Sequence, residues 1–231
     1  MSKTIIALDF STAEEVVEFL KPFEEPVYVK IGMELTYGAG LDIVRTVKEM
    51  GHHIFLDLKL HDIPNTVKGG MKNLAKLGVD LVNVHAAGGI EMMKAAVAGL
   101  EEGAAGAKRP LCIAVTVLTS VSKEAMNDQL GIPGEVQDTA IRYALNAKAA
   151  GLDGVVCSVH EAASVHEACG KDFLTVTPGI RLVSDSKDDQ KRVATPDYAK
   201  EQGCDMIVVG RSITKSADPY ETYRKIEEMM K

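Results

Sequence analysis

The chain has 231 residues, of which 46% are hydrophobic and 26% charged, a composition ordinary for a soluble globular protein. A chain of this length buries roughly 70% or more of its unfolded surface, so it can form a sizeable core. The net charge of −7 argues against broad nucleic-acid binding, which needs a basic face, whereas a local cluster of Lys and Arg would still suit an anionic small molecule.

No segment predicts export or membrane insertion. The N-terminal "MSKTIIALDF" has too short an apolar run for a signal peptide and lacks a small-residue cleavage site. No apolar run approaches the ~20 residues needed to span a bilayer. The cysteines, at positions 112, 157, 169 and 204, show no CxxC or zinc-like spacing. We therefore expect reduced thiols in a cytoplasmic protein.

Strand-like and helix-like segments alternate along the whole chain. The strand-like runs are residues 4–10, 27–33, 53–60, 81–87, 111–119, 154–159, 173–180 and 206–214. Each is followed by a segment with helical character, which predicts parallel pairing of the strands and helices that cover the sheet. Eight such units predict a single (β/α)8 barrel domain over residues 1–231, with a doubly wound open sheet as the alternative.

Helix boundaries carry recognisable capping residues. Thr12 and Glu15 have the spacing of a capping box, and Asp218-Pro219 places an N-cap before a proline at the first helical position. Glycines precede the next strand at positions 51, 78, 151 and 203.

Two connections are too long to be plain loops. Residues 181–194 are highly charged and have no apolar period, which predicts a binding loop or lid. Residues 120–135 form a second, partly helical excursion. Both follow the C-terminal end of a strand, where barrel enzymes keep their active sites.

The stretch "FLDLKLHDIPNT" (residues 55–66) places Asp57, Lys59 and Asp62 at the end of an apolar strand. Side chains alternate between the two faces of a strand, so Asp57 and Lys59 share a face with Phe55, opposite an all-aliphatic face. The aliphatic face should pack on the helices. We therefore expect both charged side chains inside the barrel.

The same alternation directs polar groups of three other strands inward. These groups are Asp9, Lys30 and His85, which lie two positions after Ala7, Tyr28 and Asn83 and therefore point to the same face of their strands. Each lies near the C-terminal end of its strand, so we predict a cluster of mutually paired charges at the barrel mouth. A Mg²⁺ site at Asp57, Lys59 and Asp62 is an alternative, because carboxylates are usual Mg²⁺ ligands, but the ammonium groups would compete for them.

Residues 56–66, "LDLKLHDIPNT", resemble the signature of the orotidine 5′-phosphate decarboxylase family, and the similarity covers essentially the whole chain. Further matching stretches are "ALDF", "VKIG", "VNVHAAGG", "TVLTS", "VTPGIR", "DDQKR" and "VVGRSIT". The DxKxxD core also occurs in related barrel enzymes that decarboxylate or condense sugar phosphates. Residues 63–66 and the set Arg181, Gln190, Gly210 and Arg211 narrow the resemblance to this family.

The resemblance implies a cofactor-free and metal-free conversion of orotidine 5′-monophosphate to uridine 5′-monophosphate and CO₂, the last step of pyrimidine synthesis. It implies a Lys30–Asp57–Lys59–Asp62 charge network, in which Lys59 is the proton donor to C6 and Asp57 lies beside the departing carboxylate. It also implies a homodimer in which Asp62, with Ile63 and Thr66, reaches into the neighbouring subunit's site. The implied substrate contacts are Asp9 and Lys30 for the ribose, Thr119 for the pyrimidine, and Arg181, Gln190, Gly210 and Arg211 for the phosphate.

Two other functions remain as alternatives at this point. One is a Mg²⁺-dependent sugar-phosphate decarboxylase or aldolase on the same scaffold. The other is a non-catalytic nucleotide-binding barrel that acts as a sensor, which the intact Lys and Asp network argues against.

Overall fold

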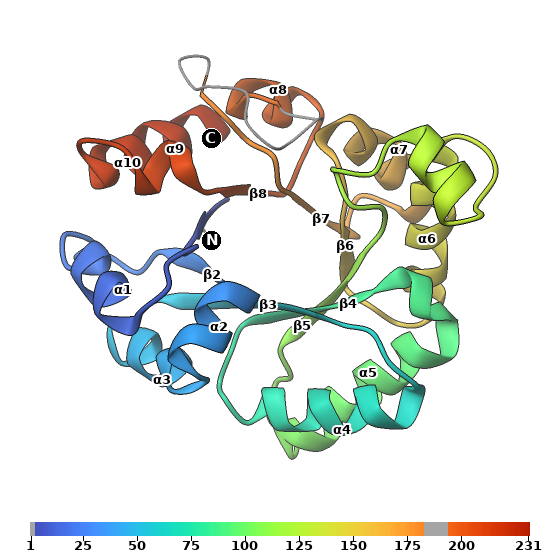
Figure 1. Ribbon diagram of the computed structural model, residues 1–231, viewed down its shortest axis with the longest axis horizontal. Coiled ribbons are helices and arrows are strands. Elements are labelled where there is room, and N and C mark those ends of the chain that lie inside the picture. Colours follow the sequence, from blue (N-terminus) through green and yellow to red (C-terminus); the bar gives the residue numbers. More distant parts are fainter. Residues whose placement is uncertain (1–2, 183–193) are drawn as a thin grey trace.

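A closed parallel barrel forms the centre of the molecule (Figure 1). The computed structural model describes residues 3–182 and 194–231. The strands are β1 (Thr4–Ala7), β2 (Tyr28–Gly32), β3 (His53–Leu60), β4 (Leu81–His85), β5 (Leu111–Val115), β6 (Gly154–Val156), β7 (Leu174–Thr177) and β8 (Met206–Val209). They are ordered as in the sequence, and β8 pairs with β1. The predicted (β/α)8 barrel is therefore confirmed, and the open sheet is not observed.

Helices surround the barrel and cover its outer face (Figure 1). The α-helices are α1 (Ala13–Leu20), α2 (Met33–Ala39), α3 (Asp42–Glu49), α4 (Pro64–Ala75), α5 (Gly89–Ala104), α6 (Val136–Ala149), α7 (Val159–Cys169), α8 (Pro196–Glu201), α9 (Arg211–Thr214) and α10 (Pro219–Met230). A 3₁₀ turn, η1 (Ala86–Gly88), and a π-helical turn, η2 (Ala125–Gln129), complete the described elements. The capping box of Thr12 and Glu15 is present at the start of α1, and Asp218 caps α10 through the Glu221 amide.

Several strands end earlier than their apolar runs in the sequence. The predicted strand over 206–214 is wrong in its second half, because β8 ends at Val209 and residues 211–214 form α9. Gly210 separates them with φ −102° and ψ −106°, a conformation that cannot continue the strand. β1 and β5 likewise stop before Asp9 and Thr119. These two residues therefore lie on loops at the barrel mouth rather than inside strands.

The core has two layers that alternate along each strand. The inner layer fills the barrel and consists of Ile5, Ala7, Tyr28, Phe55, Leu81, Ile113, Val176, Met206 and Val208. The outer layer lies between strands and helices and contains most of the remaining aliphatic residues of the strands, whereas Leu111, Val156 and Leu174 pack against the inner layer. The predicted inward orientation of Ala7, Tyr28 and Phe55 is confirmed. Polar residues that follow them with the same alternation are thereby directed to the mouth of the barrel.

At the opposite end of the barrel, three aspartates in equivalent positions link neighbouring strands. Each is the residue immediately before a strand: Asp80 before β4, Asp153 before β6 and Asp205 before β8. Their carboxylates accept hydrogen bonds from the backbone amides of Ile54, Cys112 and Thr175, at 2.8, 2.7 and 2.7 Å. Each aspartate thus ties the start of the preceding strand to its own. These hydrogen bonds stabilise the N-terminal end of the barrel, which lies opposite to the mouth.

The two long connections differ in what the structure describes. Residues 120–135 contain η2, whose Met126 is buried, so the expected partly helical excursion is confirmed. Of the segment 181–194, residues 183–193 lie outside the described residues. Its two ends are held together, since Arg181 N–H donates to Ala194 O at 2.9 Å and Ala194 N–H donates to Gly179 O at 3.1 Å.

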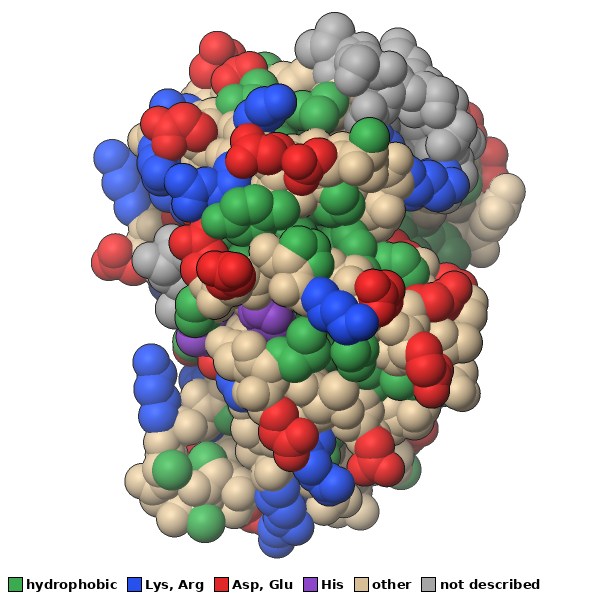
Figure 2. All heavy atoms as spheres, turned by 90° about the vertical axis from the view of Figure 1, so that its left-hand side faces the viewer, with side chains coloured by type: hydrophobic (Ala, Val, Ile, Leu, Met, Phe, Trp, Pro, Cys, Tyr) green, Lys and Arg blue, Asp and Glu red, His purple; other side chains and the backbone are tan. Residues whose placement is uncertain are grey.

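No helix within the described residues is long and apolar enough to cross a membrane. On the face that Figure 2 shows, acidic and basic side chains are interspersed rather than gathered into a basic surface. This arrangement agrees with the negative net charge of the chain.

Candidate active site

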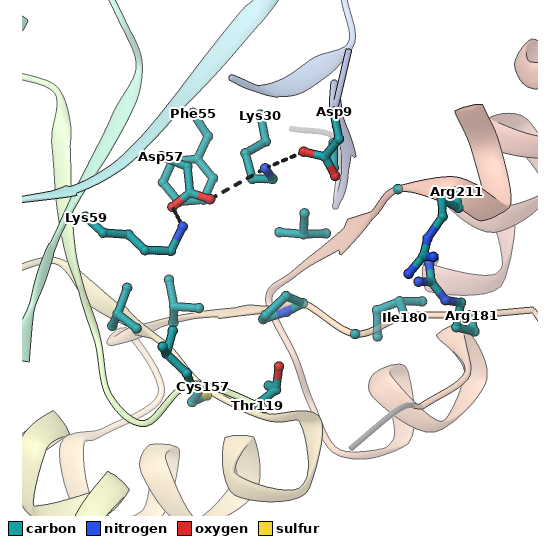
Figure 3. A pocket seen from close by; sticks show the side chains of 18 of the residues that line it. Asp9, Lys30, Phe55, Asp57, Lys59, Thr119, Cys157, Ile180, Arg181 and Arg211 are labelled. Carbon is teal, nitrogen blue, oxygen red and sulfur yellow. Dashed lines mark hydrogen bonds and ion pairs between the residues drawn. The ribbon is translucent and has the colours of Figure 1, made fainter. Parts of the chain in front are cut away.

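A cavity of about 290 Å³ opens at the C-terminal ends of the strands (Figure 3). Its polar lining consists of Asp9, Lys30, Asp57, Lys59, Thr119, Arg181, Gly210 and Arg211. The wall between these groups is largely apolar, formed by side chains that follow β5 and β7, among them Val117, Pro178 and Ile180. Residues far apart in the sequence are thus brought together as the sequence predicts.

Four of these residues form a chain of charges of alternating sign along one side of the cavity. The Lys30 ammonium lies 3.1 Å from Asp9 Oδ1 and 3.5 Å from Asp57 Oδ2. The Lys59 ammonium lies 2.7 Å from Asp57 Oδ1. Figure 3 shows all three contacts as dashed lines. Asp57 is therefore held between two cations.

Asp57 is buried, with 7% of its surface exposed. Burial alone would raise the pKa of this carboxyl, but the charges of Lys30 and Lys59 and the hydrogen bonds from Lys59 and Asn83 outweigh it, and the pKa lies below its usual range. Asp57 is consequently a fixed negative charge at neutral pH.

The backbone of β3 is irregular where it carries these charges. Leu56 pairs with Val82 and Leu60 with Val84, so three residues of β3 lie opposite the single residue Asn83 of β4. Lys59 has φ +52°, in the left-handed region. Simple alternation therefore predicted the inward direction of the Lys59 side chain but not the bulge that produces it.

Asn83 is a site residue to which sequence reasoning assigned no role. Its Nδ2 donates to Asp57 Oδ1 at 2.6 Å, and its Oδ1 accepts the Lys59 backbone N–H at 2.8 Å. The alternation along β4 placed Asn83 on the inner face, and that was the only signal for it. Next to it, His85 is half-buried beside the ring of His61, 5.6 Å between centroids, and is not part of the cavity lining.

The far end of the cavity is cationic. Figure 3 shows Arg181 and Arg211 side by side at the end opposite to Lys59. Gly210 lies immediately before Arg211, at the start of α9, and a Cβ there would be in ordinary contact with the Cβ of Ala7 at 3.6 Å and with Asp9 Oδ2 at 3.7 Å. The cavity suits a ligand with an anionic end, a flat apolar body and a second charged group near Lys59.

Three residues expected at the site lie outside the cavity lining of this chain. Asp62, Ile63 and Thr66 are exposed at the start of α4, and Ile63 keeps 66% of its surface exposed. Asp62 Oδ1 accepts the backbone N–H of Ile63 at 2.6 Å. A fourth expected residue, Gln190, lies outside the described residues. The Lys30–Asp57–Lys59 part of the expected network is thus assembled within one chain, and Asp62 is not.

No group of three or more His, Cys, Asp or Glu side chains within the described ranges is placed to hold a metal ion. At the position considered for Mg²⁺, both oxygens of Asp57 already face the ammonium groups of Lys30 and Lys59.

Several known proteins with similar sequences or structures carry the name orotidine 5′-phosphate decarboxylase. The model of the "Orotidine 5′-phosphate decarboxylase / HUMPS family" matches residues 2–226. Orotidine 5′-phosphate decarboxylases of Bacillus pumilus and Lysinibacillus sphaericus are 61% and 57% identical, over 96% and 99% of this chain and 96% and 98% of theirs. The crystal structure of orotidine 5′-phosphate decarboxylase from Lactobacillus acidophilus superposes with a TM-score of 0.89 at 43% identity, covering 100% of this chain and 99% of that one. The chain belongs to the orotidine 5′-phosphate decarboxylase / HUMPS family.

Proposed function

We propose that this chain converts orotidine 5′-monophosphate to uridine 5′-monophosphate and CO₂ without a cofactor. The observation that carries the proposal is the Lys30–Asp57–Lys59 arrangement, a buried carboxylate between two ammonium groups, at one end of a cavity whose other end holds two arginines. A nucleotide monophosphate with a carboxylate on its base has its two anionic groups at matching ends.

Lys59 carries out the proton transfer in this proposal. When the bond between C6 and the carboxylate breaks, CO₂ leaves and the electron pair stays on C6, in the plane of the ring where no π system delocalises it. A fixed ammonium stabilises this carbanion electrostatically and then gives it a proton, which forms the C6–H bond of the product. The neutral amine left on Lys59 regains its proton from solvent.

Asp57 faces the carboxylate that departs. Two like charges about 4 Å apart repel by about 4 kcal/mol at an effective dielectric near 20, and this repulsion is relieved when CO₂ leaves. Substrate reaches this position only because distant contacts hold it there. Stabilisation of the carbanion ranks first among the contributions, and ground-state repulsion second.

The distant contacts are those to ribose and phosphate. Asp9 and Lys30 bind the ribose hydroxyls, and Thr119 contacts the pyrimidine. Arg211, the amide of Gly210 and Gln190 bind the phosphate, with Arg181 at the start of the segment that closes over it. The paired ends of this segment, at Arg181 and Ala194, suit a closing loop with a fixed base.

The active unit of this proposal is a homodimer. Asp62, Ile63 and Thr66 are exposed beside the cavity mouth and would enter the site of the neighbouring subunit. The protein is cytoplasmic in this proposal. All four cysteines lie among the described residues, and no disulfide joins any of them, as suits a reducing compartment.

The test is the loss of orotate absorbance when the protein is mixed with orotidine 5′-monophosphate, with and without chelator. We expect equal rates in both. A rate abolished by the chelator would overturn the metal-free reaction. Chelator-sensitive turnover of a sugar phosphate in place of orotidine 5′-monophosphate would support a Mg²⁺-dependent sugar-phosphate decarboxylase or aldolase, which the family and its named relatives do not favour. Tight binding of uridine 5′-monophosphate with no turnover of substrate would indicate a sensor.

A further inference from the structure

We propose that Asn83 is a positioning residue of the decarboxylation, because its single amide group holds both the Asp57 carboxylate and the Lys59 backbone in their working positions. This inference rests on the proposed function. It adds to the site a residue that does not line the cavity and that acts through the two groups beside the reacting carbon.

The first observation is the place of Asn83 in the sheet. At the bulge, Asp57, Leu58 and Lys59 lie between the paired residues Leu56 and Leu60, and Asn83 is the only residue of β4 between Val82 and Val84. A regular parallel ladder cannot satisfy the backbone of the longer strand there. The Asn83 side chain replaces the missing ladder partner, since its Oδ1 accepts the Lys59 N–H at 2.8 Å.

The second observation is the backbone of Lys59. Among the described residues, only Lys59 and Ala105 have positive φ without being glycine, and Ala105 is the ordinary end of α5. For a residue with a Cβ, this conformation costs roughly 1–2 kcal/mol and persists only where the surroundings hold it. The hydrogen bond to Asn83 is an interaction that holds it, and it aims the Lys59 side chain back toward Asp57.

The third observation is the orientation of the Asp57 carboxylate. Oδ1 accepts from both Lys59 Nζ and Asn83 Nδ2, at 2.7 and 2.6 Å, so Oδ2 is left to face Lys30 at 3.5 Å. Asn83 is 1% exposed and lies directly above the inner-layer residue Leu81 of the same strand. The NH₂ group of Asn83 donates to Asp57 and its oxygen accepts from Lys59, so both ends of this buried amide are engaged.

The chemistry of the amide explains why asparagine is required. Leucine has a similar shape but would leave the Lys59 N–H without its acceptor and Asp57 without one of its donors. Aspartate would keep an acceptor for Lys59 but would put a second carboxylate 2.6 Å from Asp57, where two negative charges cannot both persist.

The experiment measures kcat, KM and the pH profile of wild type, Asn83→Leu and Asn83→Asp, together with the Kd of uridine 5′-monophosphate. We expect kcat of Asn83→Leu to fall by about 100-fold, as for misplacement of a reacting group by about 1 Å. The Kd of the product should change by less than about fivefold, since the phosphate and ribose contacts are intact. A crystal structure of Asn83→Leu should show Lys59 out of the left-handed region.

The pH profile separates positioning from a general loss of structure. Asn83 donates to the charged form of Asp57, so its removal should raise the pKa of Asp57 and move the acid limb of kcat/KM to higher pH. Asn83→Asp should move this limb further. The control is Thr116→Val, which removes a buried hydrogen bond to Val156 O at the same end of the barrel but does not contact Asp57 or Lys59. Its acid limb and kcat should match wild type.

The proposal is overturned if folded Asn83→Leu keeps kcat within about threefold of wild type, or if its kcat falls with an unmoved acid limb and an equal loss of product affinity. If Asn83→Leu does not fold, Asn83→Asp, which keeps the shape and the acceptor, decides by the same criteria. Wild type that does not turn over orotidine 5′-monophosphate would refute the proposed function instead. The Lys59 conformation in the variant structure would still test the role of Asn83.

Discussion

Lys59 and Asp57 lie two residues apart in β3, and their side chains meet at 2.7 Å inside the barrel although the pairing of β3 with β4 is irregular at these residues. The bulge changes the direction of Lys59 so that its ammonium reaches over Asp57 rather than past it. An ammonium group and a buried carboxylate are thereby adjacent at the cavity wall. This pair combines a proton source with a charge that opposes the substrate carboxylate, and it motivates the first prediction.

Lys59→Ala should nearly abolish turnover while product still binds. The loss should reach at least about 1,000-fold in kcat, since both the proton donor and the electrostatic stabilisation of the carbanion are removed. The affinity for uridine 5′-monophosphate, measured by calorimetry, should remain within about tenfold of wild type. Lys94→Ala, on the exposed face of α5, is the matched control and should match wild type. Turnover above a few per cent of wild type would remove Lys59 from the role of proton donor.

Arg211→Ala should lower kcat/KM by an amount that corresponds to about 2–5 kcal/mol of lost transition-state stabilisation, because a charge that binds the phosphate is lost. Gln190→Ala should lower it in the same way. Orotidine, the substrate without its phosphate, should suffer a comparable loss with the wild-type enzyme. The two losses should overlap, so that Arg211→Ala costs little when the phosphate is already absent.

The control for Arg211→Ala is Arg45→Ala, which removes an exposed arginine of α3. It should leave kcat/KM unchanged for both orotidine 5′-monophosphate and orotidine. If Arg211→Ala harms orotidine as badly as the full substrate, Arg211 has a structural role and is not a phosphate ligand.

The barrel and the inward charges were predictable because they depend on periodic patterns. Ala7, Tyr28 and Phe55 alternate with outward aliphatic residues, and the structure confirms their direction. Strand ends were less predictable, since nothing in the local sequence pattern separates the end of β8 at Val209 from the short helix α9 that follows Gly210. The bulge at Lys59 depends on the register between β3 and β4, a long-range property that no local pattern in β3 encodes. The role of Asn83 depends on the same register.

Asp80→Asn should destabilise the protein at neutral pH without changing its activity per folded molecule. Burial raises the pKa of Asp80, but the hydrogen bonds from the Ile54 amide, Lys48 and His53 outweigh it and hold the pKa below its usual range. A carboxyl with a lowered folded-state pKa stabilises the protein above its unfolded-state pKa of about 3.9, and this contribution is lost as pH falls through the folded-state pKa. We expect a loss of about 2 kcal/mol at pH 7, typical of hydrogen bonds to a charged group.

Urea unfolding at a series of pH values measures this effect. The difference between wild type and Asp80→Asn should shrink below about pH 4. Asp172→Asn, an exposed residue between α7 and β7, has the same change in charge and should differ from wild type by no more than about 0.5 kcal/mol at any pH. A difference for Asp80→Asn that stays constant from pH 7 to pH 3 would show that ionisation of this carboxyl does not stabilise the barrel.

The last prediction concerns which chain's Asp62 completes each site. Asp62 is exposed beyond the end of β3 and is not part of the cavity lining of its own chain, whereas Lys59 is. In a two-fold symmetric dimer, a residue that enters the partner's site is exchanged mutually. Lys59→Ala and Asp62→Asn chains should each be nearly inactive alone. They should complement one another when their subunits are exchanged.

Random exchange makes half of the dimers mixed, and each mixed dimer has one site with both lesions and one site with neither. Activity should therefore return to roughly a quarter of the wild-type site count. Lys94→Ala mixed with Asp62→Asn is a control for the mixing procedure, because half of its sites should be active whichever chain supplies Asp62 and whether or not subunits exchange. If Asp62 acts within its own chain, every site of the first mixture keeps one lesion and nothing is restored. That outcome, with exchange verified by mass spectrometry of differently tagged chains, would overturn the shared site and with it the dimer as the catalytic unit.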